Sequence, residues 1–199
     1  MSMEIREHGA DVLSAPEYGR IPIRYRVEST FRIEPVDGGL GGLSLREERV
    51  DEPYDKDYDE GNPAARFQRW HRWDLSNWRV FLARSCGRDG GDVVGGAVVA
   101  FNTDGVHLLE GRKDLAVLWD IRVRPKRRRQ GIGAELLRRA ADWARGRGCT
   151  RLKIETQNVN VPACRFYASQ GCHLGGMNCY GYEPGPCEFE TVLMWYLDL

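Results

Sequence analysis

The chain has 199 residues, of which 42% are hydrophobic, and its 29 Lys and Arg residues balance 29 Asp and Glu residues. A formal net charge of zero argues against a protein that binds nucleic acid over most of its surface. The hydrophobic content is sufficient for a core, and the length favours one domain with an extended N-terminal part.

The N-terminus, the cysteines and the histidines bear on location and metal content. Residues 1–7 lack the apolar region of a signal peptide, and no apolar run is long enough to span a membrane. The six cysteines include no C-x-x-C pair, and the four histidines include no pair at ligand spacing. We therefore expect a cytoplasmic protein with reduced thiols, no membrane partner and no metal ion.

The N-terminal third is predicted to contain a strand, a turn and a helix. Residues 21–28 alternate strictly between apolar and polar side chains, and residues 31–33 extend this strand. The glycines within residues 38–42 predict a flexible turn. Residues 63–74 are predicted to form a helix.

Residues 51–60 are the most acidic part of the chain, with six acidic side chains and two tyrosines. This composition fits a surface that steers and holds a cationic amine. A solvated acidic loop fits it equally well. Trp70, Trp73 and Trp78 are consistent with the wall of such an amine site and also with ordinary core packing.

The middle of the chain is predicted to form three strands. The first two cover residues 78–84 and 92–101, and the Gly95-Gly96 pair in the second indicates a bulge or a close backbone approach. A turn at 102–109 follows. Residues 115–123 are apolar enough to form a largely buried strand.

The hexapeptide Arg128-Arg129-Gln130-Gly131-Ile132-Gly133 joins that strand to a helix predicted over residues 134–147. Glycines at a helix start let backbone N–H groups approach an anion, and the helix dipole favours negative charge there. Arginine adds charge-assisted bonds to phosphate oxygens. Taken alone, the hexapeptide fits a site for a phosphorylated ligand and a plain arginine-rich turn equally well, and residues 124–129 also fit a nucleic-acid patch.

Three polar residues follow at the ends of predicted elements. Glu155 lies near the end of a strand over residues 151–156, and Asn160 closes a polar turn. Tyr167 lies in a short helix that ends at the C-cap glycine Gly171. Strand ends and helix ends of this kind can converge on one cleft. The remaining predicted elements are a strand at 172–182, a loop at 183–186 and a strand at 189–198.

The ordered set of these motifs resembles the GNAT superfamily of acyl-CoA-dependent N-acetyltransferases. The set is Arg128-x-x-Gly131-x-Gly133 after a strand, then Glu155, Asn160-x-x-Ala163 and Phe166-Tyr167 before Gly171. It covers roughly residues 78–199 and is more specific than any one of its motifs. Within the superfamily, several short sequence segments of this chain are most similar to those of streptothricin acetyltransferases. The segments that carry this closer similarity are 52–58, 119–121, 154–157, 163–167 and 195–197.

The resemblance implies an α/β fold with a GNAT-type mixed, mostly antiparallel sheet, splayed central strands and flanking helices. It implies a single acetyltransferase domain over residues 1–199. In this domain residues 1–77 form an N-terminal substrate-side portion and residues 78–199 form the acyl-CoA-binding core. For the oligomeric state, both a monomer and a homodimer are expected alternatives.

The resemblance also implies how acetyl-CoA is held as co-substrate. The hexapeptide cradles the CoA pyrophosphate through backbone amides, and the strand before it offers main-chain groups to the pantetheine arm. Splayed strands leave backbone groups unpaired, which is costly unless a ligand bonds them. The cofactor-binding residues implied are Ile121, Arg122, Val123, Arg128, Arg129, Gln130, Gly131, Ile132, Gly133, Ala134, Asn160 and Tyr167.

Three catalytic residues are implied. Tyr167 is the general acid that protonates the departing thiolate, and Glu155 stands where some members carry a general base. Asp120 is a rival base and an anchor for the amine. Each residue also has a non-catalytic interpretation. Tyr167 would then be a packing residue, Glu155 a solvent-facing strand residue, and Asp120 an ion-pair partner of Arg122. Direct attack with water as the base is a further alternative.

The expected function is transfer of acetyl from acetyl-CoA to a primary amine of a small cationic acceptor, by direct attack. Streptothricin-like aminoacyl antibiotics, and hence antibiotic resistance, fall within this class. Acetylation of a protein lysine or N-terminus is an alternative in the same fold. A CoA-binding sensor and an arginine-patch nucleic-acid module are alternatives from other classes. Gly171-Cys172, where the superfamily usually has Gly-Phe, and the long polar region 104–114 argue against assigning the antibiotic outright.

Overall fold

The computed structural model describes residues 3–10, 16–59, 69–86, 91–183, 185 and 187–199. The chain divides into two compact units. The first comprises Met1–Arg24, Asp57–Ile154 and Leu197–Leu199, and the second comprises Tyr25–Lys56 and Glu155–Tyr196. In the described part of the chain no helix is long and apolar enough to cross a membrane.

The described residues form a seven-stranded sheet in the order β1-β4-β5-β6-β7-β9-β8. The pairs β1–β4, β4–β5, β5–β6 and β8–β9 are antiparallel, whereas β6 and β7 are parallel. This is the mixed, mostly antiparallel α/β arrangement that the sequence predicts. The strands are β1 (Met3–His8), β4 (Arg79–Ser85), β5 (Val93–Phe101), β6 (Leu115–Val123), β7 (Arg151–Gln157), β8 (His173–Asn178) and β9 (Val192–Asp198).

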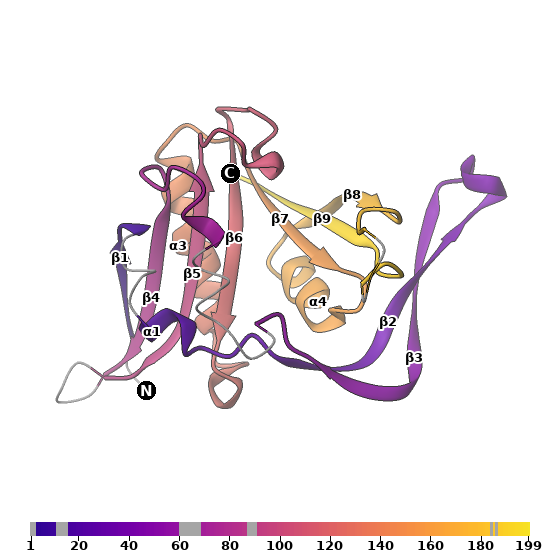
Figure 1. Cartoon of the computed structure of the whole chain (residues 1–199), viewed down its shortest axis with the longest axis horizontal. Coiled ribbons are helices and arrows are strands. Elements are labelled where there is room, and N and C mark those ends of the chain that lie inside the picture. The colour runs from indigo at the N-terminus through magenta and orange to yellow at the C-terminus, as the bar shows by residue number, and fades with distance from the viewer. Residues whose placement is uncertain (1–2, 11–15, 60–68, 87–90, 184, 186) are drawn as a thin grey trace. The chain divides into compact units, whose positions relative to one another are not determined.

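In the first unit, helix α3 (Ile132–Arg145) covers one face of β4, β5 and β6 (Figure 1). The helix is amphipathic, because its inward residues, including Leu136, are buried and its outward arginines are exposed. The short helix α1 (Pro16–Gly19) contacts β5.

The glycine pair in β5 allows both helices to approach this strand. A Cβ on Gly95 would lie 3.0 Å from Ile132 of α3, and a Cβ on Gly96 would lie 2.6 Å from the Tyr18 ring of α1. Either methyl group would force one of the helices outward. The close backbone approach predicted for these glycines is confirmed.

The central strands splay as expected. The ladder between β6 and β7 joins only Leu115–Leu118 to Arg151–Ile154, although β6 continues to Val123. The separate ladder between β5 and β6 shifts register at Trp119, since Val98 pairs with Asp120 and Val99 pairs with Leu118. In the described residues, therefore, the second half of β6 has no partner on β7, and on that side the Val123 carbonyl instead accepts a bond from Arg128 Nε.

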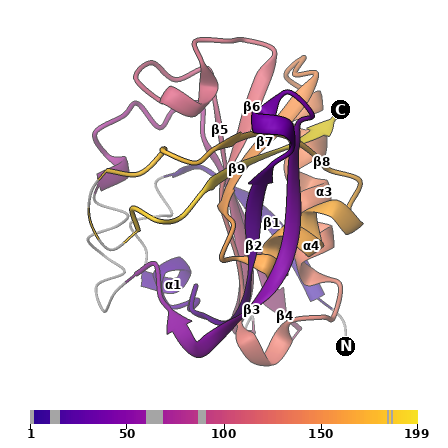
Figure 2. The same cartoon turned by 90° about the vertical axis from the view of Figure 1, so that its right-hand side faces the viewer.

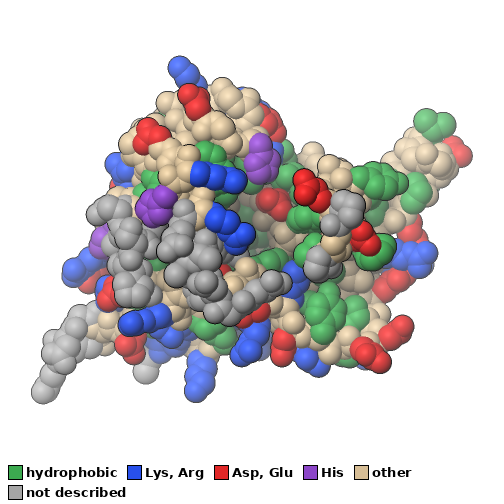
Figure 3. Space-filling view, in the orientation of Figure 1, with side chains coloured by type: hydrophobic (Ala, Val, Ile, Leu, Met, Phe, Trp, Pro, Cys, Tyr) green, Lys and Arg blue, Asp and Glu red, His purple; other side chains and the backbone are tan. Residues whose placement is uncertain are grey.

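In the second unit, strand β2 (Tyr25–Pro35) pairs with β3 (Leu43–Lys56) in a long antiparallel hairpin. A 3-10 turn at Asp37–Gly39 closes its tip, where hydrophobic side chains including Leu40 are exposed (Figure 3). Helix α4 (Val161–Ser169) packs beside this hairpin, against β2, and also contacts β8 (Figure 2).

Two expectations about the N-terminal third are wrong. Residues 21–24 are not part of a strand, because Pro22 lacks an N–H donor and the carbonyl of Ile21 instead accepts a bond from the side chain of Arg122. For the acidic segment, the loop alternative is wrong at residues 51–56, which belong to strand β3 and pair with β2 at Tyr54–Lys56. The predicted helix at 63–74 lies mostly outside the described residues, and its described end is helical only at 69–70.

The strands after residue 171 are shorter than predicted, because local turns stop them. Strand β8 ends at Asn178, whose Oδ1 accepts a bond from the backbone N–H of Tyr180 at 2.9 Å. Strand β9 begins only at Val192, after a turn in which Glu190 N–H donates to the carbonyl of Cys187 at 2.9 Å.

The cysteines act as packing residues where they are buried. Cys164 and Cys172 lie in the core, and burial raises the pKa of the Cys164 thiol to about 12 and that of the Cys172 thiol to about 11. Both thiols therefore stay protonated at neutral pH. No disulfide links the six cysteines, all of which the structure describes.

Candidate active site

The loop between β6 and α3 presents backbone N–H groups at a helix start. Gly131 is the N-cap of α3 with a φ of +81°, and no side chain caps the helix there. The first backbone bond of the helix runs from Glu135 N–H to the Gly131 carbonyl, so the preceding amides have no helical acceptor. Residues 128–131 are exposed. Together with the dipole of a 14-residue helix, this arrangement suits a phosphate group.

Two arginines of this loop hold it in place. Arg128 donates from Nε to the Val123 carbonyl at 3.2 Å and from Nη2 to the Arg24 carbonyl at 2.9 Å. Arg124 donates from Nε to the Val93 carbonyl at 2.6 Å. Guanidinium groups bound to backbone carbonyls are less available as a basic patch for nucleic acid, so the loop geometry favours a small anion held by amides.

Replacing Gly131 with Ala is expected to raise the KM for acetyl-CoA about five- to tenfold, because Ala disfavours positive φ and turns the first amides away from the anion. Gly148, beyond the other end of α3, is a matched control, with a φ of +77° and, like Gly131, nothing within 4 Å of an added Cβ. In both variants the free energy of unfolding, measured by urea denaturation, should fall by about 1 kcal/mol. Only Gly131→Ala should change the KM in a thiol-release assay. An equal KM for both variants would contradict the expectation that the amides at the start of α3 bind acetyl-CoA.

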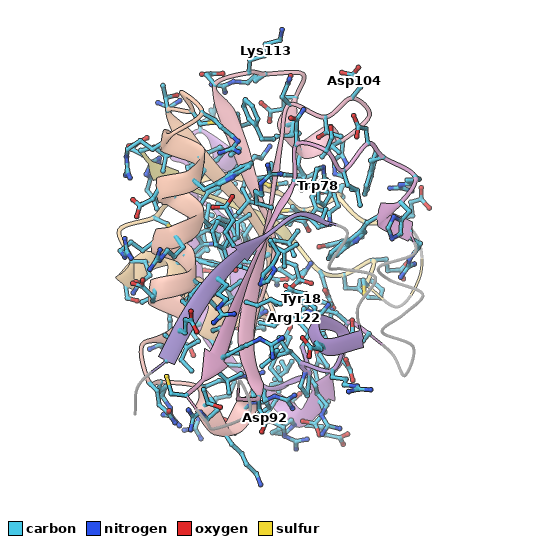
Figure 4. The ribbon with its side chains drawn as sticks, turned by 90° about the vertical axis from the view of Figure 1, so that its left-hand side faces the viewer. Tyr18, Trp78, Asp92, Asp104, Lys113 and Arg122 are labelled. Atoms are coloured by element: carbon cyan, nitrogen blue, oxygen red, sulfur yellow. The ribbon has the colours of Figure 1, made fainter. Side chains whose placement is uncertain are left out.

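Arg122 projects from β6 into a buried ion cluster in the first unit. Its guanidinium donates from Nη1 to Asp59 Oδ2 at 2.7 Å, from Nε to Asp120 Oδ2 at 2.9 Å and from Nη1 to the Ile21 carbonyl at 3.2 Å. The Arg122 side chain is fully buried, and its guanidinium carbon lies 5.4 Å from the centre of the Tyr18 ring (Figure 4). Burial is the largest single influence and disfavours the charged form, but the interactions with Asp120, Tyr18 and Asp59 together outweigh it and raise the pKa of Arg122.

Asp120 has one carboxylate oxygen bonded to Arg122 and a second oxygen that is buried. The ion pair with Arg122 expected from the sequence is confirmed on Oδ2. Among the described residues nothing donates a hydrogen bond to its buried Oδ1. A carboxylate oxygen without a donor is costly to bury, so a cationic ligand group would be stabilised there.

Four tryptophans cluster next to Asp120. Trp119, at the β6 bulge, lies 5.1 Å from Trp73, 5.2 Å from Trp78 and 6.4 Å from Trp70 between ring centroids. Trp70 and Trp78 are buried core residues, while Trp73 and Trp119 are partly exposed. The exposed ring faces can attract a cation, as Arg72 does over Trp73 at 4.1 Å. The sequence did not indicate that Trp119 joins this cluster.

The acidic segment is divided between the units. Its strand residues on β3 belong to the second unit and are mostly exposed, whereas Asp59 belongs to the first unit and is buried against Arg122. The sequence did not identify Asp59 as a partner of Arg122, because 63 positions separate them in the chain.

In the second unit, Asn160 and Tyr167 lie on α4. Asn160 is the N-cap of this helix, and its Oδ1 accepts from Ala163 N–H at 3.2 Å. Tyr167 is buried, with its ring 5.4 Å from Phe166 and 6.4 Å from Trp195. Glu155 is partly exposed and bonds to the Tyr182 hydroxyl, a contact that no sequence motif indicated.

The predicted site residues fall into two groups. The first unit holds Asp120, Ile121, Arg122, Val123, Arg128, Arg129, Gln130, Gly131, Ile132, Gly133 and Ala134. The second unit holds Glu155, Asn160 and Tyr167. Within the described residues no cluster of His, Cys, Asp and Glu has the composition of a metal site.

Residues 44–172 match the Acetyltransferase (GNAT) family. This chain belongs to that family. It is an acyl-CoA-dependent N-acetyltransferase with acetyl-CoA as its co-substrate, as the sequence resemblance implies. The amide-bearing start of α3 and the half of β6 that is not paired with β7 fit this co-substrate.

Several relatives of this chain are streptothricin acetyltransferases. The streptothricin acetyltransferase of Streptomyces lavendulae is 32% identical over 166 residues, which cover 83% of this chain and 81% of the relative. Streptothricin acetyltransferase A of Bacillus subtilis (strain 168) is 28% identical over 156 residues, covering 78% and 80%. The predicted similarity to streptothricin acetyltransferases is confirmed.

Solved structures support the fold over the whole chain. A nourseothricin acetyltransferase aligns with a TM-score of 0.74 at 26% identity, covering 100% of this chain and 99% of that one. A Bacillus anthracis str. Ames protein solved with acetyl coenzyme A aligns with a TM-score of 0.74 at 24% identity and the same coverage. The GNAT fold expected from the sequence is therefore confirmed.

Proposed function

We propose that this enzyme acetylates a primary amine of a small cationic acceptor of the streptothricin type, an aminoacyl antibiotic. The observation that carries this proposal is the 32% identity to the Streptomyces lavendulae relative over most of both chains. The buried Oδ1 of Asp120, which has no donor among the described residues, and the partly exposed Trp119 beside it support it, because a carboxylate and an aromatic face together select an ammonium group.

The proposed roles follow the chemistry of amide formation. Glu155 takes a proton from the acceptor ammonium, so that the nitrogen lone pair can attack the thioester carbonyl directly. The C–N bond forms and the C–S bond breaks, and Tyr167 donates its hydroxyl proton to the departing thiolate sulfur. Asp120 holds a second positive group of the acceptor. A polycationic aminoacyl antibiotic offers both the reacting amine and the group to be anchored.

The proposed donor contacts use backbone groups. The amides at the start of α3 hold the pyrophosphate of acetyl-CoA, and the main chain of Ile121 and the backbone N–H of Val123 hold its pantetheine arm. Arg128 acts mainly by fixing the loop, because its guanidinium already bonds two carbonyls. In this proposal the loop residues therefore position amides, and side-chain charge contributes less to donor binding than the sequence alone suggested.

A panel of acceptors tests this proposal in a thiol-release assay with acetyl-CoA. The panel is a streptothricin, free β-lysine, a lysine-containing peptide and a peptide with a free N-terminus. We expect a kcat/KM for the streptothricin about 100-fold above either peptide. Preference for a peptide would replace the proposal with protein acetylation. Binding of acetyl-CoA in calorimetry without thiol release from any amine would replace it with a CoA sensor.

A further inference from the structure

The carboxylate of Glu155 is held on one side only. The hydroxyl of Tyr182 donates to Glu155 Oε1 at 3.1 Å, and Gln157 Nε2 donates to the same oxygen at 3.4 Å. Among the described residues nothing donates to the other oxygen, Oε2. The side chain therefore has one oxygen fixed by the protein and one left for a proton.

Gln157 sets the direction of the Tyr182 hydroxyl. Its Nε2 donates to the Tyr182 oxygen at 2.6 Å, which occupies a lone pair of the phenol. The phenol proton is then directed to Glu155. Gln157 is itself fixed, because its backbone carbonyl accepts from Asn160 N–H at 3.0 Å at the start of α4.

The backbone around Tyr182 is rigid enough to place this hydroxyl. The turn before it is closed by the bond from Tyr180 N–H to Asn178 Oδ1. Gly181 lies so close to β9 that an added Cβ would be 2.6 Å from a methyl group of Val192. Side chains held by such packing lose little entropy when they orient a partner.

We propose that Tyr182 is a positioning residue for Glu155, with Gln157 as its own orienting partner. By binding Oε1, the pair locks the carboxylate so that Oε2 is the atom that receives the proton of the acceptor ammonium. This inference rests on the proposed role of Glu155 as the base. Tyr182 neither touches the acceptor nor exchanges a proton with it.

The test compares Tyr182→Phe, Glu155→Gln and the double variant under saturating acetyl-CoA and acceptor. The Phe variant keeps the ring and loses the donor, so kcat should fall about tenfold with the KM for acetyl-CoA within about twofold. Glu155→Gln should lower kcat about 100-fold, because the base is lost. The double variant should match Glu155→Gln, since a positioning residue has nothing left to position.

Tyr180→Phe is the matched control. Tyr180 lies two residues away on the same turn and is 93% exposed, so the Tyr180→Phe variant should keep the wild-type kcat. Gln157→Met removes both amide donors at constant length and should also lower kcat. If circular dichroism shows that Tyr182→Phe does not fold, the kcat of Gln157→Met decides the test instead.

The outcomes separate the two proposals. If Glu155→Gln lowers kcat and Tyr182→Phe does not, the positioning role is wrong while the function stands. If the double variant is another tenfold slower than Glu155→Gln, Tyr182 acts independently of Glu155, and the inference is also wrong. An unchanged kcat for Glu155→Gln would overturn the base assignment itself.

Discussion

Replacing Tyr167 with Phe is expected to lower kcat about 100-fold while the dissociation constant for acetyl-CoA stays within about twofold. The proposed acid supplies a proton only when the C–S bond breaks, so its loss affects the transition state more than binding. The unperturbed pKa of a thiol is about 8.5, and such a thiolate leaves with moderate ease. The expected loss is therefore at the lower end for general acid catalysis.

The fold supports this variant as a clean test. Tyr167 is buried on α4 with ring contacts to Phe166 and Trp195, and Phe preserves the ring. Tyr196→Phe serves as the control, because the Tyr196 ring stacks on His173 at 6.2 Å and the residue has no proposed catalytic role. Single-turnover kinetics and calorimetry with acetyl-CoA separate rate from affinity. A wild-type rate for Tyr167→Phe would remove this residue as the acid.

Replacing Arg122 with Met is expected to lower the free energy of unfolding by about 3–5 kcal/mol. The substitution keeps an unbranched side chain of similar length but leaves Asp59 and Asp120 buried without their counter-ion. It also removes the donor to the Ile21 carbonyl, which ties the segment after α1 to β6. Urea denaturation followed by tryptophan fluorescence measures the change.

Two further variants show whether buried charge is the cause. The triple variant R122M/D59N/D120N removes the unpaired carboxylates and should recover part of the loss. Arg6→Met breaks an ion pair of similar length, 2.8 Å to Glu4, whose side chains are more than half exposed, and should leave the urea midpoint nearly unchanged. Equal midpoints for Arg6→Met and Arg122→Met would refute a stabilising role for the cluster.

Elements with strong local signals were predicted well. Strand β6 runs over the predicted residues 115–123, and α3 and β7 begin or end within two residues of the expected positions. Continuous apolar runs, helical spacing and glycine punctuation are properties of neighbouring residues, so they are legible in one sequence. The β2–β3 pairing was missed because a hairpin partner lies elsewhere in the chain and a polar strand looks like a loop.

The sequence by itself determined the family and the donor, and it indicated the loop proposed to receive the donor, because Arg128 to Gly133 is a contiguous motif between two regular elements. Only the tertiary structure decided how the candidate catalytic carboxylates are held. It paired Arg122 with Asp59 across 63 positions and Glu155 with Tyr182 across 27. Such contacts depend on where the backbone returns in space, which no local pattern of side chains encodes.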